Sequence, residues 1–268
     1  MLYFAQGTET TNLSPEDIRK AIFEVFDGLG NREKVLILPP DFTRHHSQAG
    51  YITCLAWEYY NRKIADILPA LGTHPPMCTD EISRMFPQVP HSLFRVHKWR
   101  SDVVTLGEVP AVYIKEISEN IVDYHWPAQV NRMLVEGKYD LILSPGQVVP
   151  HEVIGLASYN KNIFIGTGGP EGINKSHFLG AAYGIERVLG RPDSPVRKVL
   201  NYASDNFTNH LPILYILTVV AKDIDGKLKV RGLFIGDDHE CYYRAAELSL
   251  KVNFTIVNKP LDKVVVYL

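Results

Sequence analysis

The chain has 268 residues, 46% of them hydrophobic, and can therefore bury the core of one large α/β domain or of two small ones. Its 28 basic and 30 acidic residues give a formal net charge of −2, which argues against nucleic acid as a partner and against a polybasic membrane patch. The three cysteines, Cys54, Cys78 and Cys241, form no CxxC pair, so neither a disulfide framework nor a thiolate zinc site is indicated. With no apolar run of the roughly 18 residues that a membrane helix needs, we expect a cytoplasmic protein without a membrane partner.

The first residues lack the basic region and the long apolar region of a secretion signal. Leu2-Tyr3-Phe4 followed by Gln6-Gly7 resembles the remnant of a protease-cleavable tag. We therefore expect residues 1–12 to be flexible and to carry no information about the fold.

Helices and strands alternate along the rest of the chain. Ser14 supplies a capping hydroxyl before Pro15 and two acids, which predicts a helix that ends near Gly28 and Gly30. The apolar runs and helical spacings after it predict, in chain order, strand 34–38, helix 48–62, strand 64–71, a helix after Thr79, strand 141–143, helices 174–189 and 194–206, strands 213–222 and 229–235 around the hairpin Asp225-Gly226, helix 237–251, and short strands 253–257 and 263–267. This order predicts an α/β fold, Rossmann-like, with a mostly parallel sheet flanked by helices and a β-hairpin insertion.

Polar residues follow three of these strands at the point where each ends. Asp41 and Arg44 follow the first, His74 follows the second, and His151 comes shortly after the third. Because ligands of parallel α/β sheets bind beyond the carboxyl ends of the strands, we expect these four side chains to meet in one crevice.

Two histidines and a lysine surround a glycine-rich turn at 166–169. His151, Lys161 and His177 each have an ordinary structural interpretation when taken singly, but their combination with His74 points to a site. The turn completes neither a GxxxxGK[ST] loop with Lys175 nor a GxGxxG motif. Two interpretations stay open for it: a non-standard anion site, or a flexible turn into a helix.

Other polar clusters have weaker patterns. Acids at 237–240 suit the first turn of a helix better than a metal site, because consecutive helical residues point in different directions. His45, His46, His91 and His97 lack a third ligand at metal spacing and are interpreted as polar loop or strand residues. His45 and His46 follow Arg44, and we expect these two to line the crevice.

Three segments together resemble the nickel-dependent lactate racemase family. Asp41-Phe42-Thr43-Arg44 matches its D-x-T-R loop, and the segment 72–77 followed by Glu81 matches G-T-H-x-P-M. His151, Lys161 and His177 match the family's triad with the same spacing, and the similarity spans nearly the whole chain.

The resemblance implies a cofactor, a nickel-pincer nucleotide, whose two sulfur-bearing arms hold nickel. Lys161 would be its covalent attachment point and His177 the protein ligand to nickel, a soft, square-planar donor set that Ni(II) accepts. Asp41, Thr43 and Arg44 would bind beside the cofactor and substrate. Arg44 would grip a carboxylate or phosphate, or else pair with Asp41.

The resemblance also implies the activity, racemisation or epimerisation of a small-molecule 2-hydroxy acid. His74 and His151 would be the acid/base pair, one on each face of the substrate, while hydride passes to the cofactor and leaves a 2-keto acid. Cofactor-biosynthesis proteins would be needed for activation. Members of the family continue into a second domain, so we expect residues 1–268 to be the N-terminal cofactor-binding and catalytic α/β domain of a longer two-domain protein.

Departures from the family pattern point to a reshaped pocket. Ser158-Tyr159-Asn160 stands where the lactate enzyme has Ser-Gly-Gly, and His45-His46-Ser47 follows Arg44 where prolines are common. A larger or more polar 2-hydroxy acid is therefore as good a candidate as lactate. Two alternatives stay open: a cofactor-binding domain without independent catalysis, and an unrelated metal-dependent isomerase or hydrolase with His74, His151 and His177 as ligands.

Overall fold

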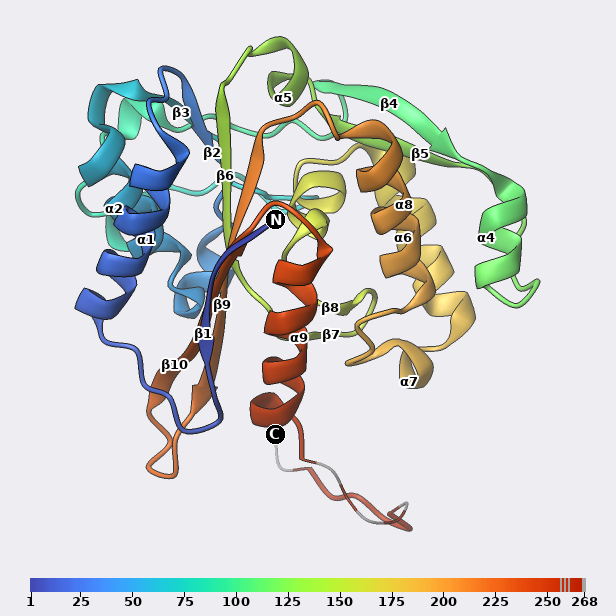
Figure 1. The fold of residues 1–268 in the computed structure, drawn as a ribbon. Coiled ribbons are helices and arrows are strands. Elements are labelled where there is room, and N and C mark those ends of the chain that lie inside the picture. The colour runs from blue at the N-terminus through green and yellow to red at the C-terminus, as the bar shows by residue number, and fades with distance from the viewer. Residues whose placement is uncertain (256, 258, 260, 267–268) are drawn as a thin grey trace.

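A six-stranded sheet forms the centre of the molecule (Figure 1). The computed structural model describes residues 1–255, 257, 259 and 261–266. The order of the strands is β1-β10-β9-β6-β2-β3, and the pairs from β3 to β9 are parallel, whereas β10 and β1 are antiparallel to their neighbours. The bounds are β1 (Leu2–Gly7), β2 (Val35–Ile37), β3 (Ile64–Ile67), β6 (Leu141–Gln147), β9 (Ile213–Lys222) and β10 (Leu228–Gly236).

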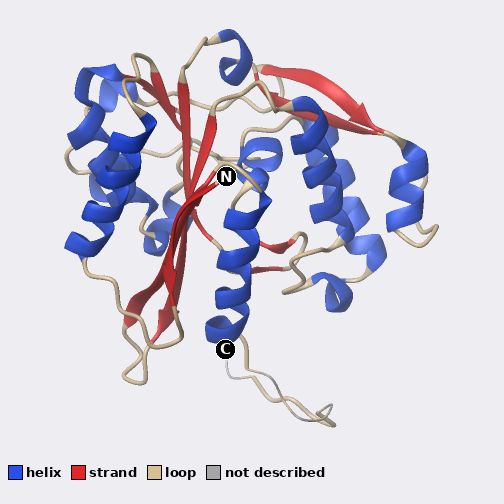
Figure 2. Cartoon of the chain, in the orientation of Figure 1, coloured by secondary structure: helices blue, strands red, loops and turns tan. Residues whose placement is uncertain are grey.

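Helices cover both faces of this sheet, as Figures 1 and 2 show. The helices α1 (Pro15–Leu29) and α2 (Ala49–Tyr60) lie on one face, and α6 (Pro170–Tyr183), α8 (Pro195–Phe207) and α9 (His239–Asn253) on the other. The predicted α/β class, with a mostly parallel sheet flanked by helices, is confirmed. The predicted hairpin forms β9 and β10 and lies within the central sheet.

The alternation of side chains along the strands produces two cores. Val35 and Ile37 of β2 pack with the α1 and α2 side, whereas Leu36 and Leu38 pack with the α6, α8 and α9 side. Because successive residues of a strand point to opposite faces, a strand covered on both sides is apolar at every position. The short run Val35-Leu36-Ile37-Leu38 is therefore apolar at every position and does not alternate between apolar and polar residues.

Smaller elements surround the sheet. A two-stranded antiparallel sheet of β4 and β5 lies beside α6 and α8, and β7 pairs with β8 after β6 (Figure 1). The remaining bounds are η1 (Phe42–Ser47), η2 (Asn61–Lys63), α3 (Thr79–Met85), η3 (His91–Leu93), β4 (Val103–Val109), α4 (Ala111–Ile117), β5 (Trp126–Asn131), α5 (Met133–Glu136), β7 (Pro150–His151), β8 (Gly155–Leu156), the π-helical turn η4 (Asn162–Gly166) and α7 (Ile185–Val188). The sequence did not predict β4, β5 or α4.

The N-terminal segment corrects one expectation. Residues 2–7 form β1, which pairs antiparallel with β10 from Leu2 opposite Gly236 to Gly7 opposite Gly232. Phe4 packs against the core on the α1 side. The expectation that the first residues are flexible and carry no information about the fold is wrong for residues 2–7, because the open edge of β10 provides backbone partners for them.

Other predicted elements differ in their bounds or do not form in the part of the chain that the structure describes. The helix predicted at 174–189 begins four residues earlier, at Pro170, and breaks at Gly184, whose φ of 104° favours glycine. Helix α9 continues to Asn253, and the described residues of the strands predicted at 253–257 and 263–267 are not in strands; residues 256 and 267 lie outside the described residues. None of the described helices has the length and apolar character that crossing a membrane requires.

Candidate functional site

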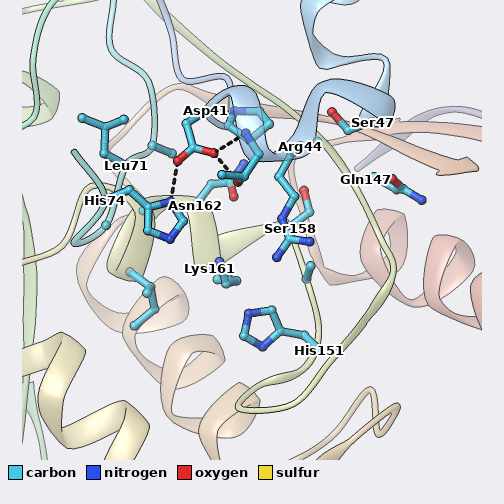
Figure 3. Close-up of a pocket in the computed structure, with 18 of the residues that line it drawn as sticks. Asp41, Arg44, Ser47, Leu71, His74, Gln147, His151, Ser158, Lys161 and Asn162 are labelled. Carbon is cyan, nitrogen blue, oxygen red and sulfur yellow. Dashed lines mark hydrogen bonds and ion pairs between the residues drawn. The ribbon is translucent and has the colours of Figure 1, made fainter. Parts of the chain in front are cut away.

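A cavity of about 220 Å³ lies at the carboxyl ends of β2, β3 and β6. The loops after these strands enclose it together with α6 and the turn before it (Figure 3). The seven residues to which the sequence gave a catalytic, cofactor-binding or metal-binding role line this cavity: Asp41, Thr43, Arg44, His74, His151, Lys161 and His177. The expected convergence of the strand-end loops is therefore observed, as the topology of a parallel sheet requires.

Asp41 holds the ring of His74. Its buried carboxylate caps η1, since Oδ1 accepts hydrogen bonds from the backbone N–H of Thr43 at 3.1 Å and from its hydroxyl at 2.5 Å. The other oxygen, Oδ2, accepts from Nδ1 of His74 (Figure 3). Because an ionised carboxylate only accepts, Nδ1 of His74 carries the proton and Nε2 keeps its lone pair.

His151 lies on the other side of Lys161 from His74 (Figure 3) and is in the opposite tautomer. Its Nδ1 accepts a hydrogen bond from the backbone N–H of Val153 at 3.2 Å, so Nε2 carries the proton in the neutral ring. Burial, and next the positive charges of Lys161 and Arg44, lower the pKa of His151 to about 3. The ring is therefore uncharged at neutral pH.

Lys161 presents a free amine to the cavity. Burial lowers its pKa to about 8, and the neighbouring Arg44 and Arg197 add to this effect. Within the described residues the amine forms no salt bridge or hydrogen bond. An amine with a lowered pKa and no partner is a better nucleophile than a solvated lysine, because a larger fraction of it is unprotonated at neutral pH.

The backbone around Lys161 is unusual. Ser158 and Tyr159, just before it, have φ values of 66° and 59°, which are rare for residues other than glycine. The π-helical turn Asn162–Gly166 follows directly, and such turns are frequent at functional sites. The N–H of Gly72 donates to the carbonyl of Gly166 at 2.8 Å and so joins this turn to the loop that carries His74.

His177 has one nitrogen available for a metal. Its Nδ1–H donates to the carbonyl of Ile173 at 2.8 Å, which leaves the lone pair on Nε2, the state in which imidazole binds metals. Within the described residues no three His, Cys, Asp or Glu side chains gather around a metal position. This contradicts the alternative of a metal held jointly by His74, His151 and His177. A metal on His177 needs further donors from a bound molecule, and the amine of Lys161 in the same cavity suits the attachment of one. The donor set therefore fits a cofactor that brings its own ligands.

Arg44 contributes an unpaired positive charge. The described residues include no acid that forms an ion pair with it, and Asp41 is engaged by His74 and Thr43 instead. The alternative of a structural pair between Arg44 and Asp41 is therefore wrong. A guanidinium that lines a cavity without a partner is suited to binding an anion.

The glycine-rich turn does not cradle an anion. The amide oxygen of Gln129 on β5 accepts the backbone N–H groups of Glu171 and Gly172, each at 3.1 Å, and so occupies the N-terminus of α6. A Cβ at Gly168 would lie 1.9 Å from the carbonyl of Phe164, so packing explains this glycine. Between the two open interpretations, the structure favours a turn into a helix, and the turn is buried rather than flexible.

The remaining histidines and acids are structural where the contacts are described. His97 is buried between the carbonyl of Gly168 and the amide of Asn131, and burial lowers its pKa. Asp238 caps α9, as expected for an acid in a first turn. His45 and His46 were expected to line the crevice, but neither does, because η1 turns them away from it and His45 lines a separate groove with Tyr51.

Several lining residues were not predicted from the sequence. They include Gln147, Glu152 and Asn162, which lie next to predicted elements or site residues in the sequence. They also include Ser158, whose hydroxyl is buried without a hydrogen-bond partner. Arg197 lies behind the cavity on α8, and no pattern in the sequence distinguishes it from a solvated helix residue.

The geometry defines an α/β protein with a polar ligand cavity at the carboxyl edge of its sheet. The sequence pattern of the lactate racemase N-terminal domain matches residues 24–186, which is more than half of the chain. The chain therefore belongs to the lactate racemase family. No curated protein matches it.

Two solved structures share the fold. A protein from Thermotoga maritima is 24% identical, with a TM-score of 0.82 over 96% of this chain and 63% of that one. The lactate racemase apoprotein from Thermoanaerobacterium thermosaccharolyticum is 19% identical, with a TM-score of 0.66 over 90% of this chain and 56% of that one. The chain thus spans less than two thirds of the length of either.

Proposed function

We propose that the protein is a racemase or epimerase of a small 2-hydroxy acid and that it carries a nickel-pincer nucleotide on Lys161, with His177 as the ligand to nickel. The observation that carries this proposal is the meeting of four side chains in one cavity. These are an amine without a partner, an imidazole with a free Nε2, and two further imidazoles on either side of the amine: Lys161, His177, His74 and His151.

His74 acts as the first proton acceptor in this proposal. Its Nε2 has the lone pair, and the carboxylate of Asp41 behind it stabilises the imidazolium that forms when the substrate hydroxyl gives up its proton. When bound, the nucleotide would supply the hydride acceptor and donor for C2 of the substrate. Arg44 would hold the substrate carboxylate, because it is the guanidinium without an ion pair among the described lining residues.

His151 serves the opposite face of the substrate. Its low pKa makes it a weak base, and part of the lowering of this pKa comes from Lys161 and Arg44. Attachment of the nucleotide through the Lys161 nitrogen would remove one of these charges, and a substrate carboxylate bound by Arg44 would neutralise the other. Both changes raise the pKa of His151 toward the range useful for proton transfer at neutral pH.

Intact-protein mass spectrometry tests the attachment. After co-expression with cofactor-making enzymes, the wild type should gain the mass of the nucleotide, whereas Lys161→Ala should not. Lys175→Ala is a matched control, since Lys175 is on the neighbouring helix and pairs with Glu171. A wild-type protein without an adduct would refute the nickel-pincer assignment. A panel of 2-hydroxy acids that includes lactate, dicarboxylates and sugar acids, followed by optical rotation, then identifies the substrate.

A second candidate is a cofactor-holding domain without catalysis of its own. It is favoured by one observation, that burial, Lys161 and Arg44 lower the pKa of His151 to about 3 and so make this histidine a weak base. The two candidates differ in exchange of the C2 hydrogen. A loaded protein that scrambles C2 deuterium between two enantiomers is a racemase, and one that binds the nucleotide without scrambling is a binding domain.

A further inference from the structure

Arg197 is a fully buried arginine that has no carboxylate partner within the described part of the chain. It lies on α8 among the apolar residues Val196, Val199 and Leu200, which face the core. Burial of a guanidinium is costly unless its donors are satisfied, and its Nε has no partner. A residue that costs stability in this way needs an explanation beyond packing.

The donors of Arg197 converge on residues 156–160, which we call the tether loop because they lead into Lys161. One terminal nitrogen donates to the amide oxygen of Asn160, and the other donates to the carbonyl of Leu156 at 2.6 Å and more weakly to that of Ser158 at 3.4 Å. The guanidinium also stands 4.4 Å from the centre of the Tyr242 ring. Arg197 therefore contacts both ends of the tether loop at once.

The tether loop needs such a clamp. Its residues Ser158 and Tyr159 both have a positive φ, a conformation that is unfavourable for residues other than glycine. The hydroxyl of Ser158 is buried without a partner. The Asn160 amide also donates to Asn201 and Ser204 on α8, at 2.8 and 3.0 Å. The strained segment is thus fastened to α8 chiefly through Arg197 and Asn160.

We propose that Arg197 is a positioning residue for Lys161: its guanidinium holds the tether loop in a strained conformation that keeps the lysine amine in the cavity, and its unpaired charge keeps that amine reactive. The charge reaches Lys161 across the loop and lowers the pKa of the amine after burial and Arg44. The other charged or titratable groups that line the cavity with this amine are Asp41, His74, His151, Glu152 and His177.

The inference rests on the proposed function in so far as Lys161 is the attachment point, and its test needs no cofactor. Trace acetylation with acetic anhydride, with free phenylalanine as internal standard, gives the reactivity and the pH midpoint of Lys161 from its peptide in a mass spectrum. The variants are Arg197→Met, which removes the charge and the two terminal donor nitrogens, which we call the fork, and Arg197→Lys, which keeps only the charge. Arg244→Met is the control, since Arg244 is an exposed residue of α9.

In the wild type we expect a midpoint near pH 8. In Arg197→Met it should rise by about one unit, with a several-fold fall in acetylation at pH 7. In Arg197→Lys the midpoint should change little, but the backbone amides of residues 156–160 should exchange hydrogen about ten times faster, because the fork is lost. Arg244→Met should match the wild type in both measurements.

Unchanged acetylation of Lys161 in a folded Arg197→Met would overturn the proposal. If that variant does not fold, Arg197→Lys decides, and unchanged hydrogen exchange in the tether loop would overturn it equally. If the wild type forms no cofactor adduct, but the Arg197 variants show the expected changes in acetylation and hydrogen exchange, the proposed function is refuted and the role of Arg197 stands.

Discussion

Nδ1 of His74 donates its proton to Oδ2 of Asp41 across 2.5 Å, and this bond fixes which nitrogen of the ring faces the cavity as a base. Asp41→Asn should keep the fold but allow the other tautomer, because an amide nitrogen donates where the carboxylate oxygen accepted. We expect the turnover of the loaded protein to fall ~100-fold or more, with little change in substrate KM.

The control for Asp41→Asn is Asp80→Asn, since the Asp80 side chain is 74% exposed. Steady-state kinetics and thermal unfolding of both variants check the expectation. Equal turnover in the two variants would show that Asp41 does not orient the base.

The buried neutral ring of His151 predicts a dependence of stability on pH. Its folded pKa of about 3 lies below the unfolded value near 6.5, so between these values the unfolded chain binds a proton that the folded chain does not. Its contribution to stability is complete above pH 6.5 and is lost as pH falls toward 3. The loss is on the order of 5 kcal/mol.

His151→Asn removes this dependence of stability on pH, because asparagine does not titrate. The asparagine amide oxygen can still accept the hydrogen bond from the N–H of Val153 in place of Nδ1. The free energy of urea unfolding, measured from pH 7 to pH 4, should fall less steeply in the variant. His97, which is also buried, keeps its own contribution in both proteins. Parallel curves would contradict the low pKa of His151.

The charge of Lys161 acts on His151. In Lys161→Met the amine is replaced by an uncharged side chain of similar length, so the pKa of His151 should rise, although burial keeps it below that of a solvated histidine. NMR titration of the imidazole C–H signals measures this shift in the cofactor-free protein. Lys20→Met, at an exposed position of α1, should leave the titration of His151 unchanged. A His151 pKa that is the same in all three proteins would show that attachment at Lys161 does not activate this histidine.

Gln129 substitutes for a cap on α6. Gln129→Ala leaves the N–H groups of Glu171 and Gly172 without their acceptor, and we expect the free energy of unfolding to fall by about 1–2 kcal/mol. Sulfate or phosphate should restore part of this loss, because an anion can then reach the helix N-terminus. Denaturant unfolding with and without sulfate checks both effects, and Gln6→Ala, at an exposed position of β1, is the comparison. No loss in Gln129→Ala relative to Gln6→Ala would show that the cap is dispensable.

The positions of the site residues followed from the sequence because a simple rule governs them. Asp41, His74 and His151 each come after a strand of a parallel sheet, and such loops meet at one edge whatever the remaining details. The capping box of α1 was equally local, since Ser14 and Asp17 satisfy each other's backbone groups three residues apart.

Features that depend on distant partners did not follow. Residues 2–7 become a strand only because β10, over two hundred residues later, has an open edge. Gln129 and Arg197 act on segments about forty residues away, and neither their types nor their neighbours reveal this in the sequence. His45 was misplaced because the direction of a side chain within η1 depends on how the helix turns after Asp41.

The bond between Gly72 and Gly166 couples the two halves of the cavity before any ligand enters. His74, the proposed base, and Lys161, the proposed attachment point, are carried by different loops, and this backbone hydrogen bond fastens one loop to the other. The entropy of aligning them is consequently lost when the chain folds and not when the substrate binds. The groups that a ligand contacts in this cavity are thus positioned before it binds, and little of its binding free energy is lost in ordering them.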